Sequence, residues 1–416
     1  MNAIIISIGN ELTTGQTVDT NSAYLAAKLA EHGITADEHW TIADDRGAIS
    51  AAFRRAAEAA DVVLVTGGLG PTQDDLTRQG LADAMGSSLV LDEKCLAQIE
   101  EFFRRRNRPM NEANRVQAMI PAGAMPLENR LGTAPGLAAR LGKANIFVTP
   151  GVPWEMKWIF ENRIAPQLPP GQGVIVHRII HTFGLGESDV GAMIADLMRR
   201  GANPLVGTTV AAGMVSIRII SEAKDRDIAR RQAGDVIQEL KRRLGDLVVG
   251  EEDQTMASVV GEMLRHRKQT VATAESCTGG MVGQTLTSIA GASDYYLGGV
   301  VAYANQAKAG LLDVPRELIA LHGAVSEPVA RAMAEGCRKH FASDWAISVT
   351  GIAGPGGGSE QKPIGLVYVG LAGPSGTQAH RHILPGTRDI VRLRATLTAL
   401  DHLRLELMRQ RPGNRE

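Results

Sequence analysis

Two apolar runs in this chain end in Thr-Gly and pass directly into turns dense in glycine. Residues 61–66 (DVVLVT) lead into GGLGPTQDD, and residues 345–349 (WAISV) lead into TGIAGPGGG. Apolar runs of this length, uninterrupted by polar residues, are typical of strands covered on both faces of a parallel sheet. Open α/β sheets bind ligands at the carboxyl ends of such strands, where glycine lets backbone N–H groups approach an anion. The pattern predicts an α/β protein with a ligand site after each run.

The length of 416 residues suits two or three domains. Strands and helices alternate in the first segment (strands 4–8 and 61–66, helices 21–31 and 49–60) and return in the third, with strands at 271–275, 296–303, 345–351 and 365–372. Between them, residues 174–244 predict strand, helix, two strands and helix, a small α+β module. The Pro/Gly-rich stretch APQLPPGQG and the polar linker GEEDQT mark the borders. We therefore expect domains at 1–170, 171–250 and 251–410, and a disordered tail, RQRPGNRE.

Charge and cysteine content exclude several classes of protein. There are 44 Lys and Arg against 45 Asp and Glu, so no global positive field favours binding to nucleic acid. The three cysteines lie far apart and without CxxC spacing, which fits a reducing compartment and neither a disulfide framework nor a zinc ribbon. No run of the chain predicts a signal peptide or a membrane helix. We expect a cytoplasmic protein without membrane partners and, as is frequent for large α/β proteins, a homodimer.

The first glycine turn, at residues 66–75, precedes a stretch with helical periodicity. Its N–H groups suit a phosphate, and the adjacent carboxylates of Asp74 and Asp75 suit a hard divalent cation that bridges to substrate oxygens. This combination favours phosphoanhydride chemistry. The alternative is structural: Thr72 and Asp75 would form a capping box, and Asp74 would only complement the helix dipole. Three further polar residues at turns could belong to the site or merely cap helices: Glu11, Asp19 and Asn21.

A basic stretch follows Phe102 and Phe103, formed by Arg104, Arg105, Arg106 and Arg108. It could contact nucleic acid, but the neutral charge of the whole chain favours a solvated helix end.

The third segment places Ser276 where a strand ends and a helix is about to begin, in TVATAESCTGG. A hydroxyl at such a corner is exposed to substrate, and nearby N–H groups can receive an oxyanion. Its candidate base is Lys308, in VAYANQAK, because a desolvated lysine can be neutral near pH 7. Tyr303 could relay a proton or orient the pair. The structural alternative makes Ser276 a helix cap and Lys308 a surface charge.

Other residues of the third segment support or compete with this site. Cys277 is a competing nucleophile, although without a histidine partner it is better explained as a small buried side chain. The loop that starts at Thr350 is so rich in glycine that it predicts a ligand, most naturally a phosphate. Arg388 and Arg392 are spaced to share a helix face and could clamp that phosphate or simply be solvated.

Taken together, these motifs resemble the competence/damage-inducible protein A (CinA) family over nearly the whole chain. The similar stretches, in family order, are GNELTTGQTVDTNSAYLA, TGGLGPTQDDLTR, NRLGTAPG, PGVPWEM, AESCTGG, VAYANQAK, HGAVSE, TGIAGPGGG and GLVYVGLA. The resemblance implies a molybdopterin-binding-like three-layer αβα domain, a KH-like α+β module and a second αβα domain with deamidase activity. The departures are small, Thr13-Thr14 for leucines and Gln73 for a proline, and remove no ligand group.

For the C-terminal domain the resemblance implies hydrolysis of nicotinamide mononucleotide to nicotinate mononucleotide and ammonia, without a cofactor. Ser276 matches the nucleophile, and Lys308 and Tyr303 match its basic partners. The residues expected to bind this substrate are Glu275, Thr278, Gly279, Asn305, Thr350, Gly351, Gly354, Gly356, Arg388 and Arg392.

For the N-terminal domain the resemblance implies hydrolysis of ADP-ribose to AMP and ribose 5-phosphate with a divalent cation (Mg, Mn or Co) on Asp74 and Asp75. Such a chain would be a bifunctional hydrolase of pyridine-nucleotide salvage. The other expected site residues are Glu11, Asp19, Asn21, Thr66, Gly67, Gly68, Gly70, Gly151 and Glu155. Two alternatives remain: an N-terminal domain that binds molybdopterin or handles adenylyl groups, and a competence or recombination accessory protein without N-terminal catalysis.

Overall fold

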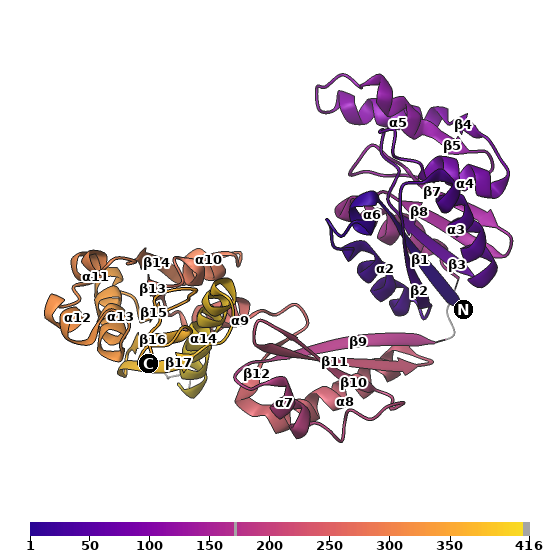
Figure 1. The fold of residues 1–416 in the computed structure, drawn as a ribbon. Helices are drawn as coiled ribbons and strands as arrows, with labels where there is room; N and C mark the ends of the chain where they lie inside the picture. The colour runs from indigo at the N-terminus through magenta and orange to yellow at the C-terminus, as the bar shows by residue number, and fades with distance from the viewer. Residues whose placement is uncertain (170–172, 411–416) are drawn as a thin grey trace. The chain divides into compact units, whose positions relative to one another are not determined.

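The computed structural model describes residues 1–169 and 173–410 (Figure 1). It contains three larger sheets, each with its own helices, which confirms the predicted α/β class. By internal packing the chain forms two compact units, Met1–Val176 with Ser221–Gln232 and His177–Ile220 with Ala233–Glu416. Within the described ranges, no helix is both long enough and apolar enough to cross a bilayer.

The first sheet has six strands in the order β2-β1-β3-β8-β7-β6. The pairs β2-β1, β1-β3 and β3-β8 are parallel, and the pairs β8-β7 and β7-β6 are antiparallel. The carboxyl ends of β1, β3 and β8 therefore meet at one edge. The strands are β1 (Asn2–Ile8), β2 (Thr35–Ile42), β3 (Val62–Thr66), β6 (Met125–Leu127), β7 (Gly136–Leu141) and β8 (Ala144–Thr149).

Helices cover both faces of this sheet, because β1 and β3 present apolar side chains in both directions. On one face Ile4 and Val63 pack with α3 and α4, and on the other Ile5 and Leu64 pack with α2 and α6. Figure 1 shows the resulting three layers. The helices are α1 (Asn10–Thr13), α2 (Thr20–Glu31), α3 (Arg46–Ala59), α4 (Thr77–Met85) and α6 (Pro153–Ile159), continued by the short turns η2 (Phe160–Ile164) and η3 (Ala165–Gln167).

A small subdomain is inserted between α4 and β6. Its two strands pair antiparallel, and α5 packs through Leu96 and Ile99 on its own minor core. The elements are β4 (Leu89–Leu91), α5 (Glu93–Arg104), η1 (Glu112–Ala118) and β5 (Met119–Pro121). The four arginines that follow Phe103 are exposed at the end of α5, as the solvated-end interpretation predicts.

The middle module has a four-stranded sheet in the order β10-β11-β9-β12. Alternate residues of β11, including Val215 and Ile217, face a core that the long helix α8 completes with Ile237 and Leu240. The elements are β9 (Val174–Thr182), α7 (Glu187–Met193), β10 (Leu205–Ala211), β11 (Met214–Ala223), α8 (Arg226–Leu244), η4 (Gly245–Leu247) and β12 (Val248–Glu251).

The C-terminal sheet has five strands in the order β14-β13-β15-β16-β17, the first three parallel and the last two antiparallel. Helices α9, α10 and α14 share a core with one face, and α11, α12 and α13 share a core with the other. The strands are β13 (Val271–Glu275), β14 (Tyr296–Val301), β15 (Trp345–Gly351), β16 (Leu366–Gly373) and β17 (Gly376–Ile383). The helices are α9 (Met256–Arg267), α10 (Met281–Thr287), η5 (Ala292–Asp294), α11 (Asn305–Leu312), α12 (Arg316–His322), α13 (Glu327–Phe341) and α14 (Arg388–Arg409).

A buried arginine of α14 forms hydrogen bonds between the C-terminal domain and the end of the middle module. Arg404 pairs with Asp401 at 2.7 Å and also donates to the carbonyl oxygens of Asp246 and Val248. These partners satisfy the guanidinium, whose burial would otherwise be costly. The contact lies within the second compact unit, which contains Asp246 and Val248 of the module together with the C-terminal domain.

The predicted strands agree with the structure to within two residues, but seven strands were not predicted: β2, β4, β5, β6, β7, β12 and β17. Of these, β2, β6, β12 and β17 are edge strands, β4 and β5 form the two-stranded sheet, and β7 lies inside the first sheet. An edge strand such as β17 (GTQAHRHI) keeps one side toward water and lacks a continuous apolar run, so it gives little sequence signal. The helix predicted after the first strand of the middle module, over residues 188–200, is shorter in the structure, because α7 ends at Met193. Of the tail expected to be disordered, residues 411–416 lie outside the described ranges.

Candidate functional site

The C-terminal site is built on the corner between β13 and α10. Strand β13 ends at Glu275, Ser276 follows it, and α10 begins only at Met281, so Ser276 does not cap this helix. From α11, which follows the neighbouring strand β14, Lys308 extends its Nζ atom to 3.0 Å from Ser276 Oγ. The structural alternative for both residues is therefore wrong. Parallel pairing of β13 with β14 explains the meeting, because it brings the carboxyl ends of both strands together.

Lys308 is a buried amine held by neutral groups. Its side chain belongs to a residue that is 1% exposed, and Nζ also donates to the carbonyl oxygens of Ala302 at 2.8 Å and Tyr303 at 3.0 Å. In the described part of the chain no carboxylate forms an ion pair with it. Burial lowers the pKa of Lys308 below its ordinary value of 10.5. A neutral amine here can give two N–H groups to the carbonyls and point its lone pair at Ser276 Oγ.

Glu275 organises the corner and was not expected to do so. Its carboxylate accepts hydrogen bonds from the backbone N–H groups of Gly280, Val282 and Gly283 at 2.8–3.0 Å, at the start of α10. These bonds occupy both oxygens and leave Glu275 in a structural position, not the substrate-binding position that we predicted. Among the described residues, no backbone carbonyl oxygen accepts the N–H groups of Cys277 and Thr278, the two residues directly after the serine.

A second group of predicted residues is gathered around Arg388, in the first turn of α14. Its guanidinium donates to the Gly354 carbonyl oxygen at 2.7 Å and to the Tyr303 hydroxyl at 3.1 Å. The Tyr303 side chain is 62% exposed and bonds to Arg388 and not to Ser276 or Lys308, so its predicted role as a proton relay is not supported by the geometry. One turn further, Arg392 donates to the Thr278 carbonyl oxygen at 2.9 Å.

The remaining predicted residues of this domain differ in what they contact. Thr350 is buried and donates to the Ala324 carbonyl oxygen, so it holds a neighbouring loop. Gly279 has a φ of +62°, which suits the tight turn after Ser276. Gly351 lies at the end of β15, while Asn305 and Gly356 are exposed. Burial raises the pKa of Cys277 to about 12, which makes it a poor competing nucleophile.

The N-terminal site is a cavity of about 410 Å³ at the carboxyl ends of β1, β3 and β8, which we call the glycine-turn cavity. Most of the residues predicted for this domain line it. They are Glu11, Gly67, Gly68, Gly70, Asp74, Asp75, Gly151 and Glu155.

Asp75 and Arg78 both bind the backbone of the glycine turn, Asp75 through the turn's N–H groups and Arg78 through the turn's carbonyl oxygens. The Asp75 carboxylate accepts from the N–H groups of Gly70 and Thr72, and from the Thr72 hydroxyl. Arg78 is buried and donates to the carbonyl oxygens of Leu69 and Gly70. Burial lowers the pKa of Arg78 to about 10, so it still carries a positive charge under the turn at pH 7. Since α4 begins at Thr77 with Leu76 as its cap, the predicted capping box is wrong.

Gly67 shows why this turn needs glycine. Its φ is +107°, and a β-carbon at this position would overlap the carbonyl oxygen of Ile8 on the neighbouring strand. Any larger residue would therefore push the turn away from the edge of the sheet.

Asp44 is an acidic residue of this cavity that sequence reasoning missed. Burial raises its pKa, and the charges of Glu11, Asp74 and Asp75 raise it further, which means that the four carboxylates lie close enough to repel each other. No three His, Cys, Asp or Glu residues of the described ranges form a complete metal cage. Mg²⁺ and similar ions commonly bind one or two carboxylates and take their other ligands from substrate phosphates and water, and this arrangement fits that mode.

Three predicted residues of this domain do not line the cavity: Asp19, Asn21 and Thr66. Asp19 caps α2 by accepting from the Ser22 N–H, as the structural alternative predicted. Asn21 donates to the Thr66 hydroxyl at the end of β3 and to the Gly151 carbonyl oxygen just after β8. It therefore links the carboxyl ends of these two strands. Gln117, Thr133 and Asp44 do line it and were not predicted. Asp44 had a signal, an acid at a strand end, but β2 was not recognised as a strand.

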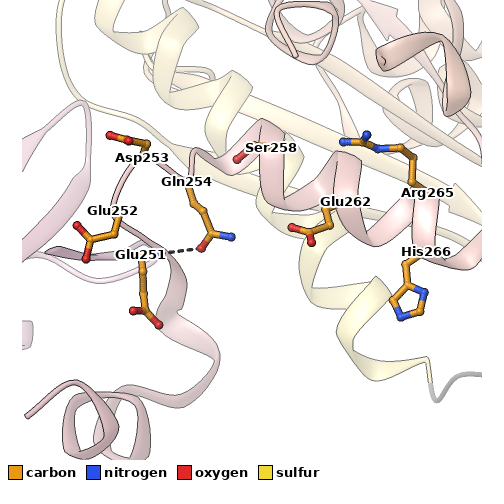
Figure 2. A pocket seen from close by; sticks show the side chains of 8 residues that line it. All are labelled: Glu251, Glu252, Asp253, Gln254, Ser258, Glu262, Arg265 and His266. Carbon is orange, nitrogen blue, oxygen red and sulfur yellow. Dashed lines mark hydrogen bonds between the residues drawn. The ribbon is translucent and has the colours of Figure 1, made fainter. Parts of the chain in front are cut away.

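A larger open cavity of about 910 Å³ lies where the middle module runs into α9 (Figure 2). Its side chains are mostly exposed, and Figure 2 shows that Glu251, Glu252 and Asp253 point in different directions. Glu251 is already paired with Arg178 and Lys241. The cavity contains neither Ser276 nor Lys308, so it is separate from both sites described above.

Fold and sites together define an α/β protein of three parts, with a buried serine–lysine pair in the last. Family models match each part: a probable molybdopterin binding domain at residues 4–170, the damage-inducible protein CinA KH domain at 177–250 and the CinA C-terminal domain at 253–407. The chain belongs to the CinA family, as its sequence motifs predicted.

The sequences of individual relatives match this chain over nearly its full length. A CinA-like protein of Geobacter sulfurreducens is 41% identical over 98% of this chain and all of its own, and one of Crocosphaera subtropica is 41% identical with the same coverage. A crystal structure of the protein CinA from Thermoplasma acidophilum is 37% identical over 40% of this chain and 98% of its own, with a TM-score of 0.38.

Proposed function

We propose that this chain is a bifunctional hydrolase of pyridine-nucleotide salvage. The C-terminal domain would convert nicotinamide mononucleotide to nicotinate mononucleotide and ammonia. The N-terminal domain would split ADP-ribose into AMP and ribose 5-phosphate. The observation that carries the first activity is the 3.0 Å contact between Lys308 Nζ and Ser276 Oγ in a buried position where, among the described residues, no carboxylate forms an ion pair with the lysine.

In the first half of the deamidation, Ser276 Oγ attacks the carboxamide carbon while neutral Lys308 takes the hydroxyl proton. The carbonyl oxygen becomes an oxyanion, for which the N–H groups of Cys277 and Thr278 are the available donors. The C–N bond then breaks, and Lys308 returns the proton to the leaving nitrogen, which departs as ammonia. The product on the enzyme is an ester of Ser276.

In the second half, a water molecule replaces ammonia. Lys308 takes a proton from the water as its oxygen attacks the ester carbon, and returns a proton to Ser276 Oγ as the ester bond breaks. Nicotinate mononucleotide is released. Arg388 is the candidate partner of the substrate phosphate, since it stands between Tyr303 and the glycine loop at Gly354.

The test is release of ammonia from nicotinamide mononucleotide. We expect Ser276→Ala to lower kcat by several orders of magnitude. The matched control is Ser288→Ala, which removes the same hydroxyl from an exposed position at the end of α10. Near-normal turnover in Ser276→Ala, or equal losses in both variants, would refute the proposed nucleophile.

The N-terminal activity rests on a glycine turn that faces four clustered carboxylates. The turn would supply N–H groups to a diphosphate. Asp75 is engaged by the turn itself, so the candidates to hold a divalent cation are Glu11, Asp74 and Asp44, of which Asp44 already accepts the Asn10 N–H with one oxygen. Such a cation would neutralise phosphate charge and activate water. Glu155, whose pKa is raised by burial, is a candidate for moving a proton in this cavity.

Incubation with ADP-ribose, with and without a chelator, tests this activity. Chelation should stop AMP formation and leave ammonia release intact. Binding of molybdopterin without cleavage of ADP-ribose would favour the alternative that the matching domain model suggests. Tight, strongly salt-dependent binding of an oligonucleotide would favour the accessory-protein alternative.

The expected homodimer and the cytoplasmic location stay predictions. Light scattering on the purified chain measures the oligomeric state directly.

A further inference from the structure

A second cavity, of about 630 Å³, lies in the N-terminal unit and has not been used so far. Part of its wall comes from the end of α5 and part from the stretch that follows β6. We call it the arginine cavity. Its lining residues are Ala97, Gln98, Glu101, Phe102, Arg105, Arg106, Glu128, Asn129 and Arg130.

The arginine cavity and the glycine-turn cavity share a wall at Asn129. The Asn129 amide donates to Glu155 Oε2 at 2.6 Å and to the Ala134 carbonyl oxygen at 2.8 Å, and both partners line the glycine-turn cavity. The Asn129 side-chain oxygen accepts from the N–H groups of Leu131 and Gly132, which fixes the loop between the cavities. A ligand too long for one cavity can therefore extend over this loop into the other.

The two cavities offer different chemistry. The glycine-turn cavity offers N–H groups and carboxylates, which suit a diphosphate and a cation, but none of its described lining residues is aromatic. A purine base needs a flat surface on which to stack. The arginine cavity has one, because the guanidinium of Arg106 lies over the Phe102 ring with its carbon 3.5 Å from the ring centroid.

Among the three arginines that line this cavity, Arg106 is the one whose guanidinium is not already paired with a carboxylate of the described residues. Arg105 pairs with Glu101, and Arg130 pairs with Glu128. Arg106, by contrast, forms no ion pair within the described ranges, and its guanidinium donates a hydrogen bond to the Phe102 carbonyl oxygen. Arg106 is an exposed residue, and a planar guanidinium stacks on bases as well as on aromatic rings.

We propose that the arginine cavity binds the purine base of a nucleoside diphosphate sugar whose diphosphate lies at the glycine turn, with the base stacked on Arg106 over Phe102. This inference rests on the proposed N-terminal activity and assigns the adenosine half of the substrate to this side of the loop. The other end, ribose 5-phosphate, then lies on the far side of the diphosphate.

The experiment uses the full chain with divalent cation and three substitutions. Arg106→Ala removes the stacking plane, Arg106→Lys keeps the charge without the plane, and Arg104→Ala is the matched control, because Arg104 is exposed on the same segment but does not line the cavity. We expect the alanine and lysine variants at 106 to raise KM for ADP-ribose about tenfold or more, with kcat within twofold. Calorimetry should show a matching loss of affinity for AMP and unchanged affinity for ribose 5-phosphate.

Several results would overturn this assignment. Unchanged KM in Arg106→Ala would do so, and normal KM in Arg106→Lys would show that charge and not stacking acts here. A larger effect of Trp154→Leu would place the base at the exposed Trp154 beside Glu155 instead. If the wild type does not cleave ADP-ribose, the proposed activity fails, but AMP calorimetry still decides this inference. AMP bound by the wild type and lost in Arg106→Ala supports it, and no AMP binding refutes it.

Discussion

Replacement of Lys308 by methionine tests the central chemical claim, that a buried neutral amine activates Ser276. Methionine fills nearly the same volume and removes only the amine. Its loss removes the proton acceptor that lies 3.0 Å from Ser276 Oγ, and no other side chain in residues 1–169 and 173–410 forms a hydrogen bond with that oxygen. Loss of a general base costs about 10²- to 10⁴-fold in kcat, which is the expected decrease for Lys308→Met.

The effect on stability should be much smaller, because two terms oppose each other. The carbonyl oxygens of Ala302 and Tyr303 lose a donor, at a cost of about 1–3 kcal/mol for each one left unpaired in the interior. In return, the folded state no longer buries an amine that is protonated at neutral pH in the unfolded chain. A large loss of kcat with little loss of stability is thus the signature of a catalytic lysine.

The pH dependence of stability and of kcat provides a separate test of whether Lys308 is neutral in the folded chain. Burial lowers the pKa of Lys308 in the folded chain, so between this value and 10.5 the unfolded state binds more protons. The free energy of unfolding of the wild type should therefore gain a contribution from Lys308 as pH rises through that window, and Lys308→Met should lack it. Wild-type kcat should rise with pH as the amine loses its proton and level off below pH 10.5.

The assay is ammonia release from nicotinamide mononucleotide between pH 6 and 10, together with urea unfolding of the same samples. Lys339→Met, at an exposed lysine of α13, is the control. If Lys308→Met keeps a third or more of wild-type kcat, or if wild-type kcat falls steadily as pH rises, the reasoning about the neutral amine is refuted.

Three further predictions follow from single contacts. Glu275→Gln should lower both stability and kcat, because an amide cannot accept all three N–H groups at the start of α10; thermal unfolding and ammonia release measure this, and an unaltered melting temperature would contradict it. Asp44→Asn should weaken metal-dependent cleavage of ADP-ribose at least tenfold and spare ammonia release, as metal titration of both activities can show. Cys277→Ala should keep deamidase kcat within about threefold, since burial keeps this thiol protonated; abolished turnover would reinstate the cysteine as nucleophile.

The outcome at individual residues shows where sequence reasoning succeeds. The corner at Ser276 was predictable because an apolar strand, two glycines and a helix follow one another within a dozen residues. Asp44 was not, because it follows β2, whose exposed, polar sequence TADEHWTI gives no strand signal. Glu275 and Asp19 illustrate the opposite error: both stand in suggestive motifs, yet backbone N–H groups nearby in the chain occupy their oxygens.

By itself, the sequence determined the α/β class, the parallel strands β1, β3, β8, β13, β14 and β15, and the segments proposed to carry chemistry, because apolar runs and glycine turns are local properties of the chain. Only the tertiary structure decided which of those segments meet. The pairing of β13 with β14 brings Lys308 to Ser276 across 32 positions of sequence, and burial there lowers the pKa of the amine. Both the distance and the desolvation depend on neighbours contributed by other strands and helices, which no single stretch of sequence specifies.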